Sequence, residues 1–164
     1  MKNKITLLLG LFIILTAFSP ARRNITIFTI GDSTMANKKL EGENPERGWG
    51  QMLSRYFTDD ITIDNHAVNG RSSKSFIDEG RWDNVLSKIQ KGDYVFIQFG
   101  HNDEKDDPKR HTDPGTTFDD NLKKFVEETR AKGGIPVLFN SIVRRNFGKS
   151  GADAVADAIK QDDI

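Results

Sequence analysis

The stretch from Ile25 to Ser33, ITIFTIGDS, decides the fold because it joins a run of β-forming residues directly to a polar turn. Its first six residues are all β-branched or aromatic, which is typical of a strand buried in a parallel sheet. Gly31 ends the run, and Asp32 and Ser33 follow where the strand stops. We therefore expect a buried strand over residues 25–30, with chemically useful side chains at its carboxyl end.

Similar runs return three times along the chain. Strands are predicted over residues 61–68, 94–99 and 136–143. Apolar residues at helical spacing predict helices over residues 49–57, 72–89 (in two pieces, broken near Gly80) and 118–129 (ended by Gly133-Gly134). The polar stretch 106–115 contains two prolines and predicts a loop. Alternating strands and helices indicate an α/β fold with a parallel sheet, and no linker divides residues 22–164 into two domains.

Composition excludes several classes of function. Lys plus Arg number 24 and Asp plus Glu also 24, so the formal net charge is zero and the basic excess typical of nucleic-acid-binding proteins is missing. The chain has no cysteine, which excludes disulfides, zinc–thiolate sites and cysteine nucleophiles. Only three histidines are present. We expect no nucleic-acid partner, no metal and no cofactor.

The first 21 residues have the layout of a secretory signal peptide. Lys2 and Lys4 precede an apolar run over residues 5–18, and the small residues Ser19 and Ala21 suit a cleavage site. The run is shorter than the roughly 20 residues that span a bilayer. We expect cleavage after Ala21, a secreted or bacterial periplasmic protein without a stable membrane anchor, and a mature domain over residues 22–164. The alternative is an uncleaved N-terminal anchor.

Three polar segments begin where predicted strands stop: Gly31-Asp32-Ser33, Asn69-Gly70-Arg71 and Gly100-His101-Asn102-Asp103. The carboxyl ends of parallel strands meet at one crevice, so a serine hydroxyl, a glycine amide and an asparagine amide would converge there. This set suits acyl transfer, in which serine attacks a carbonyl and N–H donors hold the charge that develops on oxygen. Each segment alone also fits a tight turn or a helix cap.

In these motifs the sequence resembles the SGNH/GDSL hydrolases, which are serine esterases and lipases with a flavodoxin-like three-layer α/β/α fold. The resemblance implies Ser33 as the nucleophile, and the backbone N–H groups of Ser33 and Gly70 with the side chain of Asn102 as the oxyanion hole. The stretches GDSTMA, NHAVNGRSS, FIQFGHNDEK, TDPGTT and SIVRR are most similar to rhamnogalacturonan acetylesterases. The resemblance thus implies a carboxylic ester hydrolase whose substrate is acetylated pectin or a small ester.

The family's remaining motif, Asp-x-x-His, supplies the base that activates the serine, and it is not found here. The residues three positions before His66, His101 and His111 are Ile63, Gln98 and Pro108. We therefore expect the 164 residues to be truncated at the C-terminus and feebly active or inactive. The other explanation is a substitute histidine. His101 is expected to face away from Ser33 if Asn102 faces it, His66 to lie inside a strand, and His111 in a solvated loop.

Other residues have two interpretations each. Arg71, Arg144 and Arg145 could bind the carboxylates of a galacturonate polymer, or form solvated basic turns. For Trp49 and Trp82, helical context favours core packing over stacking on sugars. Asp32 is expected to fix its loop by accepting hydrogen bonds, rather than to serve as the triad acid.

Two further functional alternatives remain from the sequence. A metal-dependent phosphoesterase would use Asp32, His101, Asn102 and Asp103, although two-metal sites need more ligands. A non-catalytic carbohydrate-binding remnant would keep the crevice and lack the base. A third possibility is a fragment that does not fold stably.

Overall fold

A computed structural model describes residues 23–42 and 44–143. The expected signal peptide and its cleavage site lie outside these residues, as do Arg144 and Arg145. Within the two described ranges, no helix is long and apolar enough to cross a membrane.

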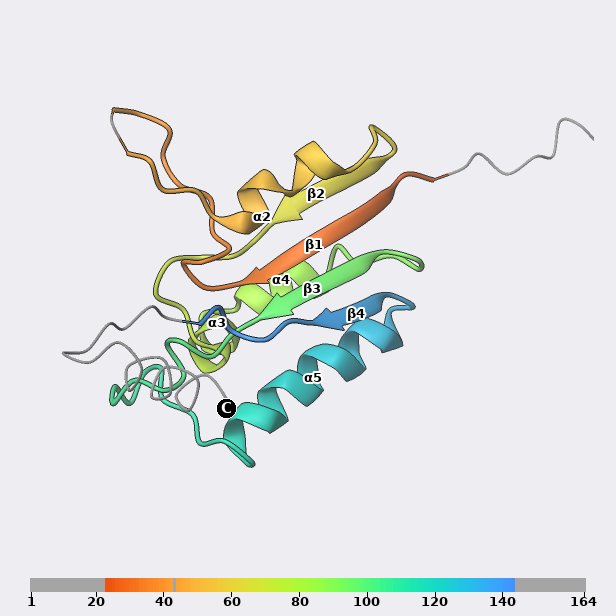
Figure 1. Ribbon diagram of the computed structural model, residues 1–164. Coiled ribbons are helices and arrows are strands. Elements are labelled where there is room, and N and C mark those ends of the chain that lie inside the picture. The colour runs from red at the N-terminus through yellow and green to blue at the C-terminus, as the bar shows by residue number, and fades with distance from the viewer. Residues whose placement is uncertain (1–22, 43, 144–164) are drawn as a thin grey trace, which may run out of the picture.

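Four parallel strands form the sheet, as predicted (Figure 1). They are β1 (Ile25–Gly31), β2 (Ile61–Asn65), β3 (Tyr94–Gln98) and β4 (Ile135–Leu138), in the order β2-β1-β3-β4. β1 is central, so that Ile27 pairs with Ile63 on one side and Tyr94 on the other. This order is the flavodoxin-like one, with its switch point between β1 and β3.

Two strands end earlier than the sequence predicts, although backbone bonds continue for a short way beyond them, from Phe139 N to Ile97 O (2.9 Å) and from His66 N to Thr29 O (2.9 Å), with side-chain contacts added there. β4 stops at Leu138 rather than residue 143, and beyond it the Gln98 side chain donates to Asn140 O (2.7 Å) while the Ser141 hydroxyl donates to Phe99 O (2.8 Å). β2 stops at Asn65, whose side-chain oxygen accepts from Ala67 N (3.1 Å).

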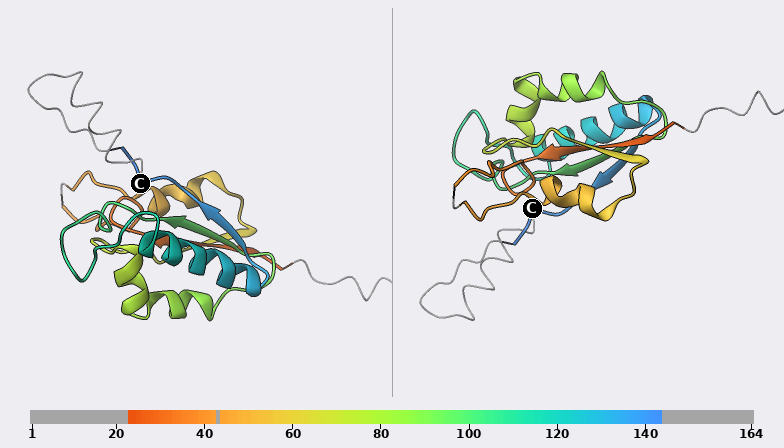
Figure 2. Two further views of the ribbon diagram at one scale, coloured as in Figure 1. Left: turned by 90° about the horizontal axis from the view of Figure 1, so that it is seen from below. Right: turned by 90° about the horizontal axis from the view of Figure 1, so that it is seen from above.

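Helices cover both faces of the sheet and make three layers. α3 (Ser73–Asp78), α4 (Arg81–Leu86) and α5 (Thr117–Ala131) lie on one face, whereas α2 (Trp49–Met52) and the 3-10 helix η1 (Leu53–Tyr56) lie on the other (Figure 2). Gly80 separates α3 from α4 in the left-handed region (φ 67°), which glycine adopts without strain. The predicted break near Gly80 is therefore confirmed.

The main core lies between the sheet and the layer of α3, α4 and α5. Phe28 and Ile30 of β1 and Val95 and Ile97 of β3 face this layer and are at most 3% exposed. Trp82 of α4 is fully buried there, as expected, and packs edge-on against Phe125 of α5 with ring centroids 4.9 Å apart.

A smaller cluster on the opposite face lies behind the segment that follows β1. Met35, Ala36 and Ala67 are buried there, and the partly buried Trp49 packs against them. Trp49 also donates from Nε1 to Gln98 Oε1 (2.6 Å), which in turn accepts from the Thr34 hydroxyl (3.0 Å). Trp49 is thus tied into the fold through its indole nitrogen, in line with the core interpretation.

Candidate active site

The three polar segments predicted at the strand ends lie together in the structure. Val68 N donates to Gly31 O (3.0 Å), which ties the second segment to the first. Asn102 Nδ2 donates to Arg71 O (3.1 Å), which ties the third segment to the second. His101 Nδ1 lies 3.7 Å from Asp32 Oδ2, which brings the third segment to the first. The third segment therefore contacts both of the others, and the residue directly before the second segment binds the first.

The turn that presents Ser33 is held by the buried carboxylate of Asp32. Asp32 Oδ1 accepts from Thr34 N (2.8 Å) and from the Thr34 hydroxyl (2.9 Å), and its backbone carbonyl accepts from Ala36 N (3.0 Å). The Asp32 side chain thus fixes the loop, as expected. Ser33 is partly exposed, and no side chain within residues 23–42 and 44–143 hydrogen-bonds to its hydroxyl.

Gly70 and Asn102 are the residues predicted to supply the other two donors. Gly70 has a φ of 75°, so the Asn69-Gly70 turn uses the left-handed conformation that glycine favours. Asn102 is only 3% exposed, and its amide oxygen accepts from Lys105 Nζ (3.0 Å) while Nδ2 donates to Arg71 O. An amide nitrogen carries two hydrogens, and the bond to Arg71 O uses one of those of Asn102.

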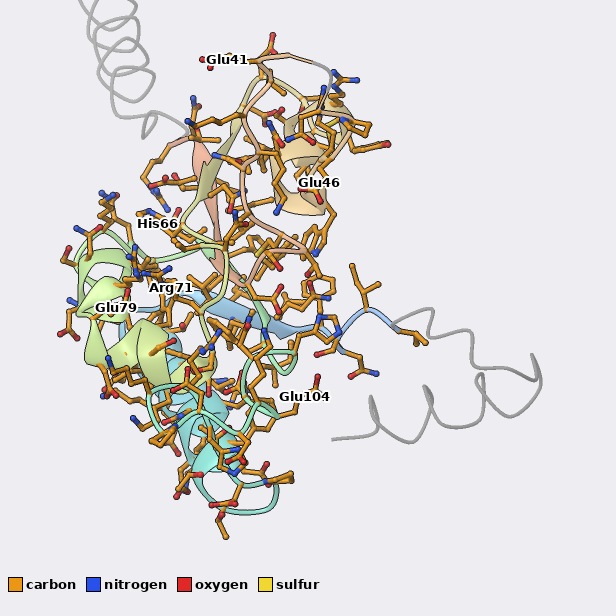
Figure 3. The ribbon with its side chains drawn as sticks, turned by 90° about the vertical axis from the view of Figure 1, so that its left-hand side faces the viewer. Glu41, Glu46, His66, Arg71, Glu79 and Glu104 are labelled. Carbon is orange, nitrogen blue, oxygen red and sulfur yellow. The ribbon has the colours of Figure 1, made fainter. Side chains whose placement is uncertain are left out.

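Arg71 is held by its neighbours in the protein. Its Nε lies 3.2 Å from Glu79 Oε2, and its Nη1 donates to Asn69 O (3.0 Å), with Arg71 and Glu79 adjacent in Figure 3. Arg81 also binds Glu79 (2.5 Å). The hydrogen bond from Arg81, followed by that from Arg71, outweighs partial burial and lowers the pKa of Glu79. Arg71 and Arg81 therefore share one carboxylate of the protein itself, that of Glu79.

Asp103 fastens the segment that carries Asn102. Its carboxylate is 3% exposed and accepts from Ser73 N (2.9 Å), the Ser73 hydroxyl, the Thr112 hydroxyl (3.1 Å) and Gly100 N (3.1 Å). These bonds connect the end of β3 to the start of α3 and to residue 112. Burial raises the pKa of Asp103, although the hydrogen bonds from Ser73, Thr112 and Gly100 act in the opposite direction.

Asp103→Asn is expected to lower the free energy of unfolding by about 1–3 kcal/mol, because an amide group presents N–H donors where the protein also presents donors. The pKa of Asp103 is raised in the folded state, so its contribution to stability is complete below the unfolded pKa and declines as the pH rises through the folded pKa. The cost of the substitution should therefore be smaller at about pH 7 than at about pH 4. Urea unfolding of both proteins at the two pH values measures this difference, and an equal or larger cost at the higher pH would contradict it.

The contacts found for the three histidines are to groups other than Ser33. His101 Nε2 lies 2.7 Å from Ile142 O and can only donate to that carbonyl, while Nδ1 faces Asp32. His111 is 43% exposed in its loop, as expected, and its Nδ1 lies 3.1 Å from Lys105 O.

His66 does not lie inside a strand, so that expectation is wrong. β2 ends one residue earlier, at Asn65, although His66 N still donates to Thr29 O of β1 (2.9 Å). His66 is partly exposed, and its Nε2 lies 3.0 Å from Asp64 Oδ2 and 3.4 Å from Lys88 Nζ (Figure 3 labels His66). Its ring is thus engaged at the edge of the sheet by an acid and a lysine.

The side chains considered for a metal are engaged by other protein groups, and two of them, Asp32 and His101, face each other at 3.7 Å. Asp103 and Asp32 accept the protein hydrogen bonds described above, and Asn102 binds Arg71 and Lys105. Across the described part of the chain, no group of three or more His, Cys, Asp or Glu side chains could hold a metal ion. The phosphoesterase alternative thus finds no ligand set among these residues.

Sequence analysis predicted Ser33, Gly70 and Asn102, and it named Asp103 without its anchoring role. It missed Lys105 and Gln98, which, with Asp103, hold the site together. Their partners lie 3 to 64 residues away, and only the short Asn102–Lys105 spacing is visible locally. The presence of Asp103 directly after Asn102 was the one signal that could have indicated an anchoring carboxylate.

Comparison with known proteins gives consistent results. The model of the GDSL-like Lipase/Acylhydrolase family matches residues 29–162. Rhamnogalacturonan acetylesterase RhgT of Bacillus subtilis is 40% identical over 130 residues, covering 79% of this chain and 54% of the relative. Probable rhamnogalacturonan acetylesterase YesY of the same species is 38% identical over 123 residues, covering 74% and 55%. The chain therefore spans about half the length of the curated relatives it matches.

Solved structures show the same fold. The crystal structure of the YxiM protein of Bacillus subtilis has a TM-score of 0.64 and 25% identity, and the match covers 84% of this chain and 41% of that one. The psychrotrophic esterase EstA of Pseudoalteromonas has a TM-score of 0.53 at 22% identity, covering 83% and 70%. The four-stranded parallel sheet and its helices thus correspond to part of a larger α/β fold.

Proposed function

The chain belongs to the GDSL-like lipase/acylhydrolase family, and from this premise we propose that it is a serine esterase that removes acetyl groups from a plant cell-wall polysaccharide such as rhamnogalacturonan. The observation that carries the proposal is the contact between the segments of Ser33, Gly70 and Asn102 at the carboxyl end of the sheet. The choice of substrate is supported by relatives named rhamnogalacturonan acetylesterases at about 40% identity. Secretion after cleavage of the signal peptide remains part of the proposal.

In the proposed reaction, the Ser33 hydroxyl oxygen attacks the acetyl carbonyl carbon and loses its proton to a base. The carbonyl oxygen becomes an oxyanion, which the N–H groups of Ser33, Gly70 and Asn102 stabilise. Collapse of this intermediate breaks the bond to the sugar oxygen, which takes up a proton, and leaves an acetylated Ser33. Water then attacks the acetyl group, releasing acetate and restoring the serine.

His101 is poorly placed to act as the general base for Ser33, because its ring nitrogens face Ile142 O and Asp32. We propose that the chain by itself hydrolyses 4-nitrophenyl acetate with a Ser33-dependent turnover below about one per second. Losing one member of a catalytic triad typically costs about 10⁴–10⁶ in rate.

Added imidazole can act as the base in the proposed reaction and gives the sharpest test. We expect imidazole to raise the rate of acetate release from acetylated rhamnogalacturonan severalfold, because a general base is then available to Ser33. Ser33→Ala should abolish this increment. Without imidazole, the same substitution should change little, because catalytic groups that act as a unit lose most of their effect together.

Ser54→Ala is the matched control, since Ser54 is exposed on η1 and takes no part in the proposed site. An imidazole-dependent rate that persists in Ser33→Ala would contradict the assignment of the nucleophile. Binding of the acetylated polymer without any Ser33-dependent release would instead favour the carbohydrate-binding alternative.

A further inference from the structure

We propose that Lys105 is a positioning residue for the reaction, because it fixes the orientation of the Asn102 amide and strengthens its free N–H as a donor. The inference rests on the proposed function, in which this N–H contacts the oxyanion. Lys105 Nζ donates to Asn102 Oδ1 at 3.0 Å, and no other described residue outside the Asn102 segment donates to that oxygen.

Two contacts select the same orientation of the amide. Arg71 O can only accept, so it requires Nδ2 of Asn102 on its side, at 3.1 Å. The ammonium of Lys105 can only donate, so it requires Oδ1 on the other side. Turning the amide over would set two oxygens against each other at Arg71 and two donor groups against each other at Lys105. With both contacts present, the orientation of the second N–H of Asn102 Nδ2 is fixed.

Backbone contacts place Lys105 where it can do this. Lys105 N donates to Asn102 O (3.4 Å), so the two residues belong to one turn. Lys105 O accepts from Asp107 N (2.7 Å) and faces His111 Nδ1 (3.1 Å), which ties the residue into the following loop. The turn thus holds the backbone of Lys105 beside the Asn102 amide, to which the long lysine side chain binds.

The charge of the ammonium adds to the geometry. A hydrogen bond from a charged donor is roughly twice as strong as a neutral one, and hydrogen bonds in a chain polarise one another. Asn102 is 3% exposed, so the acceptor end of this contact is shielded from water, while Lys105 itself is exposed. Electron density drawn toward Oδ1 leaves the Nδ2–H groups more positive, which favours an oxyanion over a neutral carbonyl. The effect on the proposed reaction should therefore appear in kcat more than in KM.

The test compares Lys105→Met, which keeps the length of the side chain without its charge and donors, with Lys105→Arg, which keeps both. Lys109→Met is the matched control, because Lys109 is an exposed lysine of the same loop with no side-chain bond to Asn102. In ¹⁵N-labelled protein, Lys105→Met should shift the side-chain amide signals of Asn102 and speed their exchange with water about tenfold, whereas Lys105→Arg and Lys109→Met should not. A Lys105→Met protein with unchanged Asn102 signals would overturn the proposal.

Imidazole-assisted release of acetate gives the second measurement. Lys105→Met should lower kcat about tenfold at nearly constant KM, and Lys105→Arg should recover most of the loss. An effect confined to KM would overturn the role in donor strength. Absence of any Ser33-dependent release in the unsubstituted chain would count against the proposed esterase, while the amide signals would still decide whether Lys105 positions Asn102.

Discussion

Asn102→Ala is expected to reduce the imidazole-dependent increment in the deacetylation rate about 10²- to 10³-fold, the usual cost of removing one side-chain donor from an oxyanion hole, so that the total rate falls close to the rate without imidazole. The effect is large because Asn102 is buried and its amide is held from both sides, by Arg71 O and Lys105 Nζ. A donor fixed in advance loses no energy to reorganisation when charge develops on the substrate oxygen. Initial rates of acetate release over a range of substrate concentrations measure the loss, which should fall on kcat.

Folding has to be separated from chemistry in this variant. Removing the amide leaves Arg71 O and the Lys105 ammonium without a partner, at a cost of about 1–3 kcal/mol in stability. Urea unfolding therefore accompanies the kinetics, and Asn84→Ala, an exposed asparagine of α4, serves as the control for substitution itself. A well-folded Asn102→Ala protein with an unchanged rate would remove Asn102 from the proposed oxyanion hole.

Trp82→Ala is expected to lower the free energy of unfolding by about 3–5 kcal/mol, the range for deleting a large buried aromatic side chain. Trp82 is fully buried, packs against Phe125 at 4.9 Å between centroids, and donates from its indole nitrogen to Glu128. Small domains have only about 5–15 kcal/mol of net stability. Urea unfolding followed by far-UV circular dichroism should show a large fall in the midpoint.

Two variants define what Trp82 contributes. Trp82→Phe keeps most of the buried ring but loses the bond to Glu128, so it should cost about 1–2 kcal/mol. Tyr56→Ala, at a residue 80% exposed, should stay within about 0.5 kcal/mol of the parent. A Trp82→Ala protein as stable as Tyr56→Ala would mean that the layer of α3, α4 and α5 is not the main core. A broad, non-cooperative transition in the parent would favour the alternative of an unstable fragment.

The strands and helices could be predicted because their signals are local. The β-branched run at residues 25–30 and the apolar stripe of residues 118–129 each identify an element from neighbouring residues alone. The structure places β1 at Ile25–Gly31 and α5 at Thr117–Ala131, within two residues of those expectations. Gly80 likewise indicated a helix boundary without knowledge of any partner.

The ends of β2 and β4 could not be predicted in this way. The regular strands stop at Asn65 and Leu138, while single backbone bonds to the neighbouring strands continue and the side chains of Asn65 and Gln98 add contacts of their own. Gln98 acts on Asn140, 42 residues away. No local pattern indicates a contact between residues so far apart.

For the candidate site, the sequence predicted which segments meet, but not the hydrogen-bond partners of their side chains. Ser33, Gly70 and Asn102 follow the carboxyl ends of parallel strands, and topology alone brings such ends together. The orientation of the Asn102 amide depends on Arg71 O, 31 residues earlier, and the anchoring of Asp103 on Ser73, 30 residues earlier. These contacts exist only once the sheet has formed.

The central place of β1 in the sheet also governs the order in which the protein can assemble during synthesis. β1 is made before the other three strands, yet Gly31 must pair with Gln98 on β3. At about 5–20 residues per second of translation, one edge of this apolar strand waits several seconds for its neighbour. An unpaired edge of this kind attracts other chains and chaperones. The period of greatest risk of aggregation is thus set by topology and passes before the core exists.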